Sequence, residues 1–402
     1  MGQTLSEPET RKDSSSGHDS QLHWAASSMQ GWRVSMEDAH TTLLKVEGKD
    51  GFSFFGVYDG HGGVRAAKFS GANLHKRIVQ SAHFESGKYK DAIKAGFLGT
   101  DVDLRTEADP DLQSDTSGCT AITALITKDH QLFVGNAGDS RAVLSVRGDA
   151  EPLSFDHKPA NKDESARIFA AGGFIEFGRV NGNLALSRAL GDFEFKNNKI
   201  LSPEQQIVTA NPDIIEHSLD FTKDEFIVLA CDGIWDCMSN QDVVEFVRRG
   251  LAADLTLEEI CERMMDRCLA KDTELAGVGC DNMTVIIVAI LGSHPTYDSW
   301  KSWVSHDVNP LPPPSFGEET HGEGSDSSAG GPDGKSLTSL YPPASTSPPS
   351  SSSSSSSAAL SGAPITTSSD AINLSNPNIP DSLVSKDTSK ERGNDEKKDT
   401  TG

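Results

Sequence analysis

Three acidic residues stand at the ends of apolar runs, a pattern that joins a charged group to a segment expected to be buried. Asp59 follows the run 52–58, Asp232 follows Cys231 at the end of the run 225–230, and Asp281 precedes the run 283–290. Burying a carboxylate at the end of a strand is costly unless a cation or a hydrogen-bond network receives it. These acids, far apart in the sequence but in the same setting, predict one shared metal site with oxygen ligands.

The ligand types restrict which metal could bind. Asp59, Asp232 and Asp281 offer hard carboxylate oxygens, and no histidine pair or cysteine cluster accompanies them. That combination favours Mg²⁺ or Mn²⁺ over Zn²⁺. Two such ions about 4 Å apart can share a water, lower its pKa and direct it at a phosphorus or carbonyl centre.

Further residues near the first run could assist hydrolysis. Glu37 is another acid, four residues after Arg33, and His61 comes two residues after Asp59. A guanidinium group pairs bidentately with phosphate oxygens, which suits Arg33 to a phosphoryl substrate. His61 could protonate a leaving alkoxide. The alternative readings are a surface ion pair between Arg33 and Glu37 at helical spacing and a purely structural histidine.

Two more acids are ambiguous on their own. Asp139 lies in the segment Asn136 to Ser140, where aspartate is common because it favours turns, so a turn residue and a metal ligand remain equal alternatives. Asp236, four residues after Asp232, is either a helix-entry residue or an outer-sphere ligand, and its spacing does not decide between them. Asp59 taken alone would also be read as a turn residue before glycine.

The overall composition excludes some classes of function. The 402 residues carry a net charge of −23, which argues against a nucleic-acid-binding protein because phosphate backbones require clustered Lys and Arg. No apolar run approaches the roughly 18 residues needed to span a bilayer. The opening residues, with Gly2 and Ser6, fit the N-myristoylation pattern, but with only Arg11 and Lys12 nearby such a lipid would give weak, reversible membrane contact.

The six cysteines form no CxxC pair, and no secretory signal peptide is evident, so we expect reduced thiols and a cytoplasmic or nuclear location. We also expect a monomer.

Changes in composition divide the chain into three parts. Residues 1–21 are polar and Ser-rich and are predicted to be a flexible lead, and residues 22–293 alternate apolar runs with glycine turns, as an ordered domain does. Residues 294–402 include eight consecutive serines and are predicted to be a disordered Ser/Pro-rich acidic tail. Trp300 and Trp303 are apolar exceptions that we expect to dock on the domain.

Local patterns predict the elements that must position these residues. Strands are expected at 52–58, 119–127, 131–136, 141–146, 225–230 and 283–290, and 131–146 resembles a hairpin. Helices are expected after the double glycine at 62–63, and after the capping-box pairs Ser239/Asp242 and Thr256/Glu259. Strands without regular helix alternation favour an α+β fold in which antiparallel strands form a sandwich with helices packed on it.

Several separated motifs together resemble the metal-dependent Ser/Thr protein phosphatases of type 2C, the PPM family. The similarity covers roughly residues 22–292, keeps the family's motif order and is most like fungal members. The motifs are Arg33 with Glu37-Asp38, Asp59-Gly60-His61-Gly62-Gly63, Ser117 to Ala121, Gly138 to Arg141, His157-Lys158-Pro159, Arg179 to Gly182, Ser187 to Asp192, Asp232-Gly233 with Asp236, and Asp281-Asn282.

The resemblance implies a fold and a division of labour among these residues. The fold would be two packed antiparallel β-sheets flanked by helices, an α-β-β-α sandwich, with the metals in a cleft at one end and residues 160–192 as a flap beside it. Asp59 would bridge two ions. Arg33 would bind the substrate phosphate, and His61 would act as the general acid. The remaining members of the implied metal set are Glu37, Asp38, Gly60, Asp139, Asp232, Asp236 and Asp281, of which Asp139 and Asp236 would serve a weaker third ion.

The resemblance also implies the reaction, which is hydrolysis of phosphoserine and phosphothreonine in phosphoprotein substrates by a hydroxide bridging two Mg²⁺ or Mn²⁺ ions. A phosphatase-like binding scaffold would need a defective metal set, and no ligand position is missing. A nuclease is disfavoured by the net charge and the lack of basic clusters.

Overall fold

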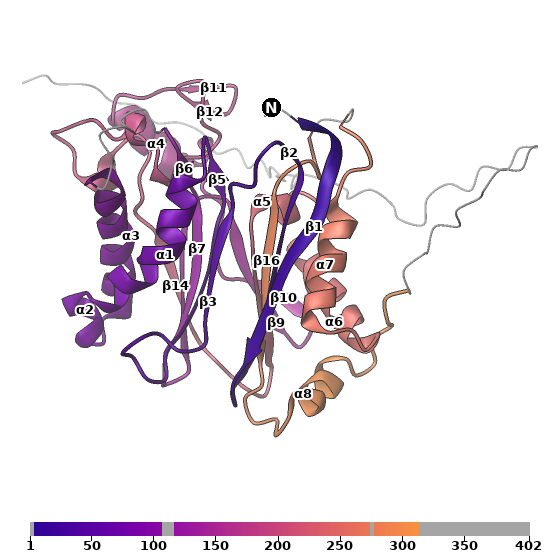
Figure 1. The fold of residues 1–402 in the computed structure, drawn as a ribbon. Helices are drawn as coiled ribbons and strands as arrows, with labels where there is room; N and C mark the ends of the chain where they lie inside the picture. The colour runs from indigo at the N-terminus through magenta and orange to yellow at the C-terminus, as the bar shows by residue number, and fades with distance from the viewer. Residues whose placement is uncertain (1–3, 107–115, 274–276, 313–402) are drawn as a thin grey trace, which may run out of the picture. The chain divides into compact units, whose positions relative to one another are not determined.

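Two antiparallel sheets lie face to face in the computed structural model, which describes residues 4–106, 116–273 and 277–312 (Figure 1). One sheet has six strands, in the order β1 (Thr4–His18), β2 (Leu22–Arg33), β16 (Met283–Ile290), β15 (Asp224–Ala230), β9 (Arg141–Val146) and β10 (Asp149–Pro152). The other has five, in the order β14 (Asp213–Ser218), β8 (Gln131–Ala137), β7 (Ala121–Ile126), β4 (Ser53–Tyr58) and β3 (Ala39–Leu43).

Helices cover the outer face of each sheet, so the layers run helix, sheet, sheet, helix (Figure 1). The five-stranded side carries α1 (Arg65–Val79), α2 (Ala82–Glu85) and α3 (Tyr89–Thr106), and the six-stranded side carries α6 (Asn240–Ala252), α7 (Leu257–Cys268) and α8 (Tyr297–Val304). One apolar cluster fills the space between the sheets, and one more lies under each helical layer. The predicted α+β sandwich is confirmed.

Smaller elements surround one end of the sandwich. They are α4 (Lys162–Ala170), α5 (Asp232–Trp235), β5 (Gly60–His61), β6 (Gly118–Cys119), β11 (Ile175–Glu176), β12 (Arg179–Val180), β13 (Leu190–Gly191) and two short 3₁₀ helices, Phe193–Phe195 and Pro203–Gln205. The predicted flap contains α4 and the β11–β12 hairpin, and it has its own apolar cluster around Ile168 and Val180.

The long apolar strands and the capped helices lie where the sequence predicts them. The run 225–230 falls within β15, every residue of which is buried, and 283–290 is β16. Ser239 accepts a hydrogen bond from the Asp242 amide at the start of α6, and Thr256 does the same for Glu259 at the start of α7. These side chains satisfy amides that have no partner within the helix.

The predicted hairpin at 131–146 is wrong. β8 pairs with β7 and β14, whereas β9 pairs with β15 and β10, so the two segments belong to different sheets. The turn residues Gly138 to Ser140 therefore carry the chain across from one sheet to the other. A turn pattern shows that the chain changes direction but does not specify the next strand's partner, and here the crossing places Asp139 at the sandwich end.

Within the segment predicted to be a flexible lead, Thr4–His18 form the strand β1. β1 pairs with β2 through the register from Ser14↔Ser27 to His18↔His23. Its side chains are mostly exposed, which explains why no apolar periodicity reveals it. Lys12 forms an ion pair with Asp266, and Ser14 Oγ donates to Glu262 Oε1 at 2.6 Å, which ties the strand to α7. Gly2, the proposed lipidation site, lies outside the described residues.

The ordered domain extends beyond the predicted boundary at residue 293. Trp300 in α8 is fully buried, and its indole Nε1 donates to the Glu225 carbonyl at 3.1 Å, so its predicted docking is confirmed. The chain then continues along α6, where the Leu311 amide donates to the Arg249 carbonyl at 3.0 Å. The rest of the predicted disordered tail, from residue 313, lies outside the described residues.

Two further expectations from the sequence, on the cysteines and on membrane-spanning helices, can be compared with the structure. All six cysteines lie in the described ranges and are free thiols, as predicted. Within those same ranges, the structure has no helix with both the length and the apolar character needed to cross a bilayer.

Candidate active site

Four of the predicted acidic ligands meet at one end of the sandwich. Asp59 follows β4, Asp232 begins α5 after β15, Asp281 precedes β16, and Asp139 lies on the crossing between β8 and β9. All four line one cavity of about 290 Å³, whose other lining residues are Arg33, Gly60, His61, Thr120, Arg179, Leu184, Ala185 and Leu186. The structure thus brings residues from four separate segments into a single cleft.

The cleft concentrates more negative charge than its neighbouring protein cations can neutralise. The pKa of Asp59 is raised well above its ordinary value, first by burial and then by the charges of Asp232 and Asp38. Burial likewise raises the pKa of Asp232, with the charges of Asp139 and Asp281 adding to the effect. Such carboxylates either take up protons or receive a cation, and closely grouped oxygen donors suit a hard divalent ion.

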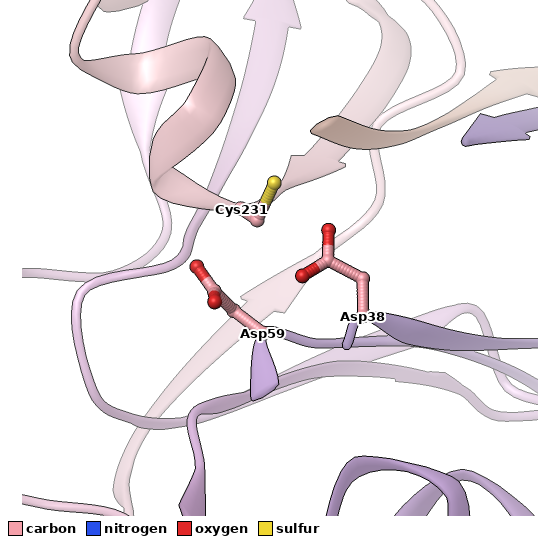
Figure 2. A group of neighbouring side chains, drawn as sticks. All are labelled: Asp38, Asp59 and Cys231. Atoms are coloured by element: carbon pink, nitrogen blue, oxygen red, sulfur yellow. The ribbon is translucent and has the colours of Figure 1, made fainter. Parts of the chain in front are cut away.

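Asp38 lies beside Asp59 and is buried (Figure 2). Its Oδ2 accepts a hydrogen bond from Thr284 Oγ1 at 2.7 Å, whereas its buried Oδ1 has no hydrogen-bond partner among the described residues. Burial is the main reason that its pKa rises to about 6. A buried, unpartnered carboxylate oxygen is costly unless something positive satisfies it, which fits a nearby ion.

A thiol shares this space, although the sequence pointed only to oxygen ligands. Ligand atoms of Asp38, Asp59 and Cys231 lie within 4.8 Å of one another, and Figure 2 shows the three side chains facing a common space. The Cys231 sulfur accepts from the Thr284 amide at 3.1 Å, and burial raises the thiol's pKa well above its ordinary value. A neutral thiol is a poor ligand for Mg²⁺ or Mn²⁺, so the carboxylates dominate the donor set.

Glu37 is partly buried and is held by hydrogen bonds. Its Oε2 accepts from the Gly63 amide at 3.1 Å and its Oε1 from Ser35 Oγ at 2.7 Å. Its own amide donates to Asn282 Oδ1 at 2.9 Å. Gly60 must approach this segment closely, because a Cβ there would lie 2.2 Å from the Glu37 carbonyl oxygen.

Asp139 and Asp236, the two residues predicted to hold a third ion, differ in solvent exposure. Asp139 is buried, with 4% of its surface exposed, and forms an ion pair with Lys158. Asp236 is exposed at the end of α5, one turn after Asp232, and its amide donates to the Asp232 carbonyl at 2.8 Å. Lys158 is a cation at the site to which the sequence assigned no role.

Comparison with known proteins agrees with this geometry. The family described as "Protein phosphatase 2C" matches residues 22–276. A protein phosphatase 2C homolog 2 from Schizosaccharomyces pombe is 56% identical over 79% of this chain and 87% of its own length. A probable protein phosphatase 2C from Caenorhabditis elegans is also 56% identical, over 72% of this chain and 81% of its own.

The chain belongs to the protein phosphatase 2C family. It is therefore a metal-dependent enzyme of the protein serine/threonine phosphatase class, acting on phosphoproteins. A solved phosphatase from a pathogenic Toxoplasma gondii strain matches with a TM-score of 0.61 and 27% identity, over 71% of this chain and 98% of that one. A serine-threonine phosphatase 2C from Toxoplasma gondii, 21% identical with a TM-score of 0.60 over 70% of this chain and 99% of that one, supports the fold.

The phosphatase site also contains residues whose contacts could not be predicted from the sequence. Asn282 Nδ2 donates to the carbonyls of Gln30 and Ser35 at 2.8 and 2.9 Å, which fixes the segment carrying Arg33. His61 Nε2 lies 2.9 and 2.8 Å from the two oxygens of Asp192. Burial lowers the pKa of His61, but the hydrogen bond and charge of Asp192 outweigh it, and the net pKa is raised. Asn282 and Asp192 occur in the quoted motifs, but only the fold shows what they contact.

Proposed function

We propose that this phosphatase hydrolyses phosphoserine and phosphothreonine directly, without a phosphoenzyme, using two Mg²⁺ or Mn²⁺ ions in the cleft. The observation that carries the proposal is the convergence of Asp59, Asp232 and Asp281 on the cavity that also receives Arg33. Hard oxygen ligands beside a guanidinium group form a site suited to a phosphate monoester.

The described residues suggest how the ions would be held. Asp59 would bridge the two ions, with Asp232 and Asp281 on one of them and Gly60 and Glu37 completing the set. Asp38 would contribute through its unpartnered oxygen. When bound, the ions would lower the pKa of a shared water and so supply hydroxide at neutral pH. Asp139 and Asp236 would hold a weaker third ion.

Two cleft residues would act on the substrate itself. Arg33, at the end of β2, is partly exposed in the cavity, where its guanidinium group would bind and orient the phosphate. His61 lines the same cavity and would donate a proton to the leaving serine or threonine oxygen. An alkoxide is a poor leaving group, so this proton matters most for alkyl phosphates.

The test is phosphate release from a phosphothreonine peptide by metal-stripped protein, with and without added Mn²⁺ or Mg²⁺. We expect activity only with metal, and loss of that activity in Asp59→Asn. Asp129→Asn, which changes an exposed acid in the turn between β7 and β8 that does not line the cleft, is the matched control and should behave as the unmodified chain does. A folded, metal-loaded protein with no turnover would refute catalysis and favour a phosphoprotein-binding scaffold.

A further inference from the structure

A small sheet assembled from three dipeptides holds His61. β5 pairs with β6, with His61 opposite Gly118, and β6 pairs on its other side with β13, with Gly191 opposite Gly118. The three dipeptides come from well-separated parts of the chain, and β13 leads directly into Asp192. His61 and Asp192 therefore meet across one residue, Gly118.

The backbone at Asp192 is fixed independently of its side chain. Its φ of 49° places it in the left-handed region, and its amide donates to the Ser117 carbonyl at 3.1 Å. The preceding amide, of Gly191, donates to Asp101 Oδ1 at 2.8 Å. A non-glycine residue in this conformation is uncommon and is maintained only by its surroundings. Such strain is consistent with a carboxylate that must occupy one particular place.

Gly118 provides the space in which the two side chains meet. A Cβ on Gly118 would lie 2.1 Å from Asp192 Oδ2 and 2.6 Å from His61 Nε2. Any side chain there would push the carboxylate and the imidazole away from their present positions.

The contact determines which imidazole nitrogen remains for chemistry. Both Asp192 oxygens face Nε2, and Asp192 itself is buried, with 4% of its surface exposed. The structure shows no hydrogen-bond partner for His61 Nδ1 within the described ranges, and the ring lines the cleft. In the imidazolium form both ring nitrogens carry a proton, so a carboxylate that accepts from Nε2 fixes the ring orientation and leaves the Nδ1 proton for the substrate.

We propose that Asp192 is a positioning residue that holds His61 through Nε2, so that the Nδ1 proton is donated to the leaving oxygen of the phosphorylated residue as the bond between that oxygen and phosphorus breaks. This inference rests on the general-acid role proposed above for His61. Asp192 directly follows β13 and is the last residue of the predicted flap, 160–192. The flap would therefore help to position the general acid.

The test compares two substrates with different leaving groups. We expect Asp192→Ala to lower kcat on a phosphothreonine peptide at least about 10-fold, since general acid catalysis contributes 10²–10⁴-fold, while changing kcat on p-nitrophenyl phosphate less than about 3-fold. In a His61→Ala background, Asp192→Ala should have no further effect on the peptide, because the residues act as a unit. Asp192→Asn keeps an acceptor oxygen and should restore part of the peptide activity.

Two further variants separate positioning from folding. Gly118→Ala keeps both side chains but displaces them, so it should show the same selective loss on the peptide. Asp101→Asn disturbs the Gly191 amide without touching His61, so any loss should be equal on the two substrates. Thermal unfolding of every variant checks that the domain is intact.

Some results would contradict the positioning role of Asp192. Equal losses on both substrates in Asp192→Ala and Asp192→Asn, or an additive effect with His61→Ala, would overturn the positioning role. If His61→Ala itself showed no dependence on the leaving group, both the general-acid role and this inference would fail. Metal-dependent turnover by the unmodified chain would still support the proposed phosphatase reaction in that case.

Discussion

Arg33 and Asp281, which both line the cleft, form an ion pair that joins the residue proposed to bind phosphate to a residue proposed to bind metal. The contact links the end of β2 to the start of β16, which are neighbouring strands. Both side chains are partly exposed, at 40% for Arg33 and 31% for Asp281, so a substrate phosphate can reach the guanidinium group. The pair thereby holds Arg33 in the cavity before substrate arrives.

Replacing Arg33 should impair substrate use more than folding. A charge-assisted hydrogen bond contributes about 1.5–3 kcal/mol, so Arg33→Ala should lower kcat/KM for a phosphopeptide by about 10- to 150-fold. Arg33→Lys should recover only part of this, because an ammonium group cannot bind phosphate bidentately. Steady-state kinetics with added Mn²⁺ measure the effect, with Arg11→Ala, an exposed arginine on β1, as the control. Unchanged kinetics in Arg33→Ala would remove it from phosphate binding.

Lys158 should compete with any ion that binds Asp139. Because its ammonium group forms an ion pair with the buried Asp139, a third ion must displace or share this contact. We expect Lys158→Met to strengthen Mn²⁺ binding at the weakest site several-fold, as measured by calorimetric titration of the protein. Lys162→Met, an exposed lysine at the start of α4, should leave binding unchanged. Weaker Mn²⁺ binding in Lys158→Met would show that the lysine supports the third site.

The sequence predicts the parts of this fold that depend on local patterns. A fully apolar run such as 283–290 identifies a buried strand, and the capping pair Ser239/Asp242 identifies a helix start, because both signals lie within a few residues. The acids that follow or precede such runs were found for the same reason. Chemistry at a strand end is visible because the polar residue interrupts a pattern that is otherwise apolar.

The sequence alone does not show which residues and strands, far apart in the chain, contact one another. Asp192 contacts His61 across a separation of 131 residues, and no local pattern around either residue refers to the other. The sheet change between β8 and β9 was missed for the same reason, since a turn looks alike whether its strands pair or not. The strand β1 was missed because backbone pairing with β2, rather than apolar side chains, holds it.

Truncation should reveal that the folded domain ends after α8. Trp300 is fully buried against the layer under α6 and α7, and losing a buried aromatic side chain costs about 3–5 kcal/mol. A chain ending at residue 293 should therefore unfold at much lower urea concentration, and Trp300→Ala should reproduce most of that loss. Trp303→Ala, at a partly buried position of the same helix, should cost clearly less. A chain ending at residue 312 should match the full chain, because the sequence predicts disorder beyond it.

The stability of the truncated chains is measured by urea unfolding, followed through tryptophan fluorescence and circular dichroism. If the chain ending at 293 were as stable as the full chain, α8 would contribute nothing to the core and the original boundary would stand.

Glu164 should make the stability of the flap depend on acid pH. It is 3% exposed, and its oxygens accept from Arg167 Nη1 at 2.7 Å, Arg188 Nη2 at 2.7 Å and Ser187 Oγ at 2.6 Å. Burial raises its pKa, but the hydrogen bond from Arg188 and the arginine charges outweigh burial and lower it from 4.5 to about 2. That lowering corresponds to roughly 3 kcal/mol of stability in favour of the ionised form.

The lowered pKa determines the direction in which stability changes with pH. The contribution is fully present above the ordinary pKa of 4.5 and is lost as the pH falls towards 2, where the folded-state carboxylate takes up its proton. Glu164→Gln resembles the protonated form, so its deficit in unfolding free energy should be roughly 3 kcal/mol at pH 7 and should shrink steadily below about pH 4. Urea unfolding of both proteins between pH 3 and 7 measures the difference, and Glu176→Gln, an exposed glutamate in β11, should show none. A deficit that stayed constant across this range would mean that Glu164 acts through shape and hydrogen bonding rather than through its charge.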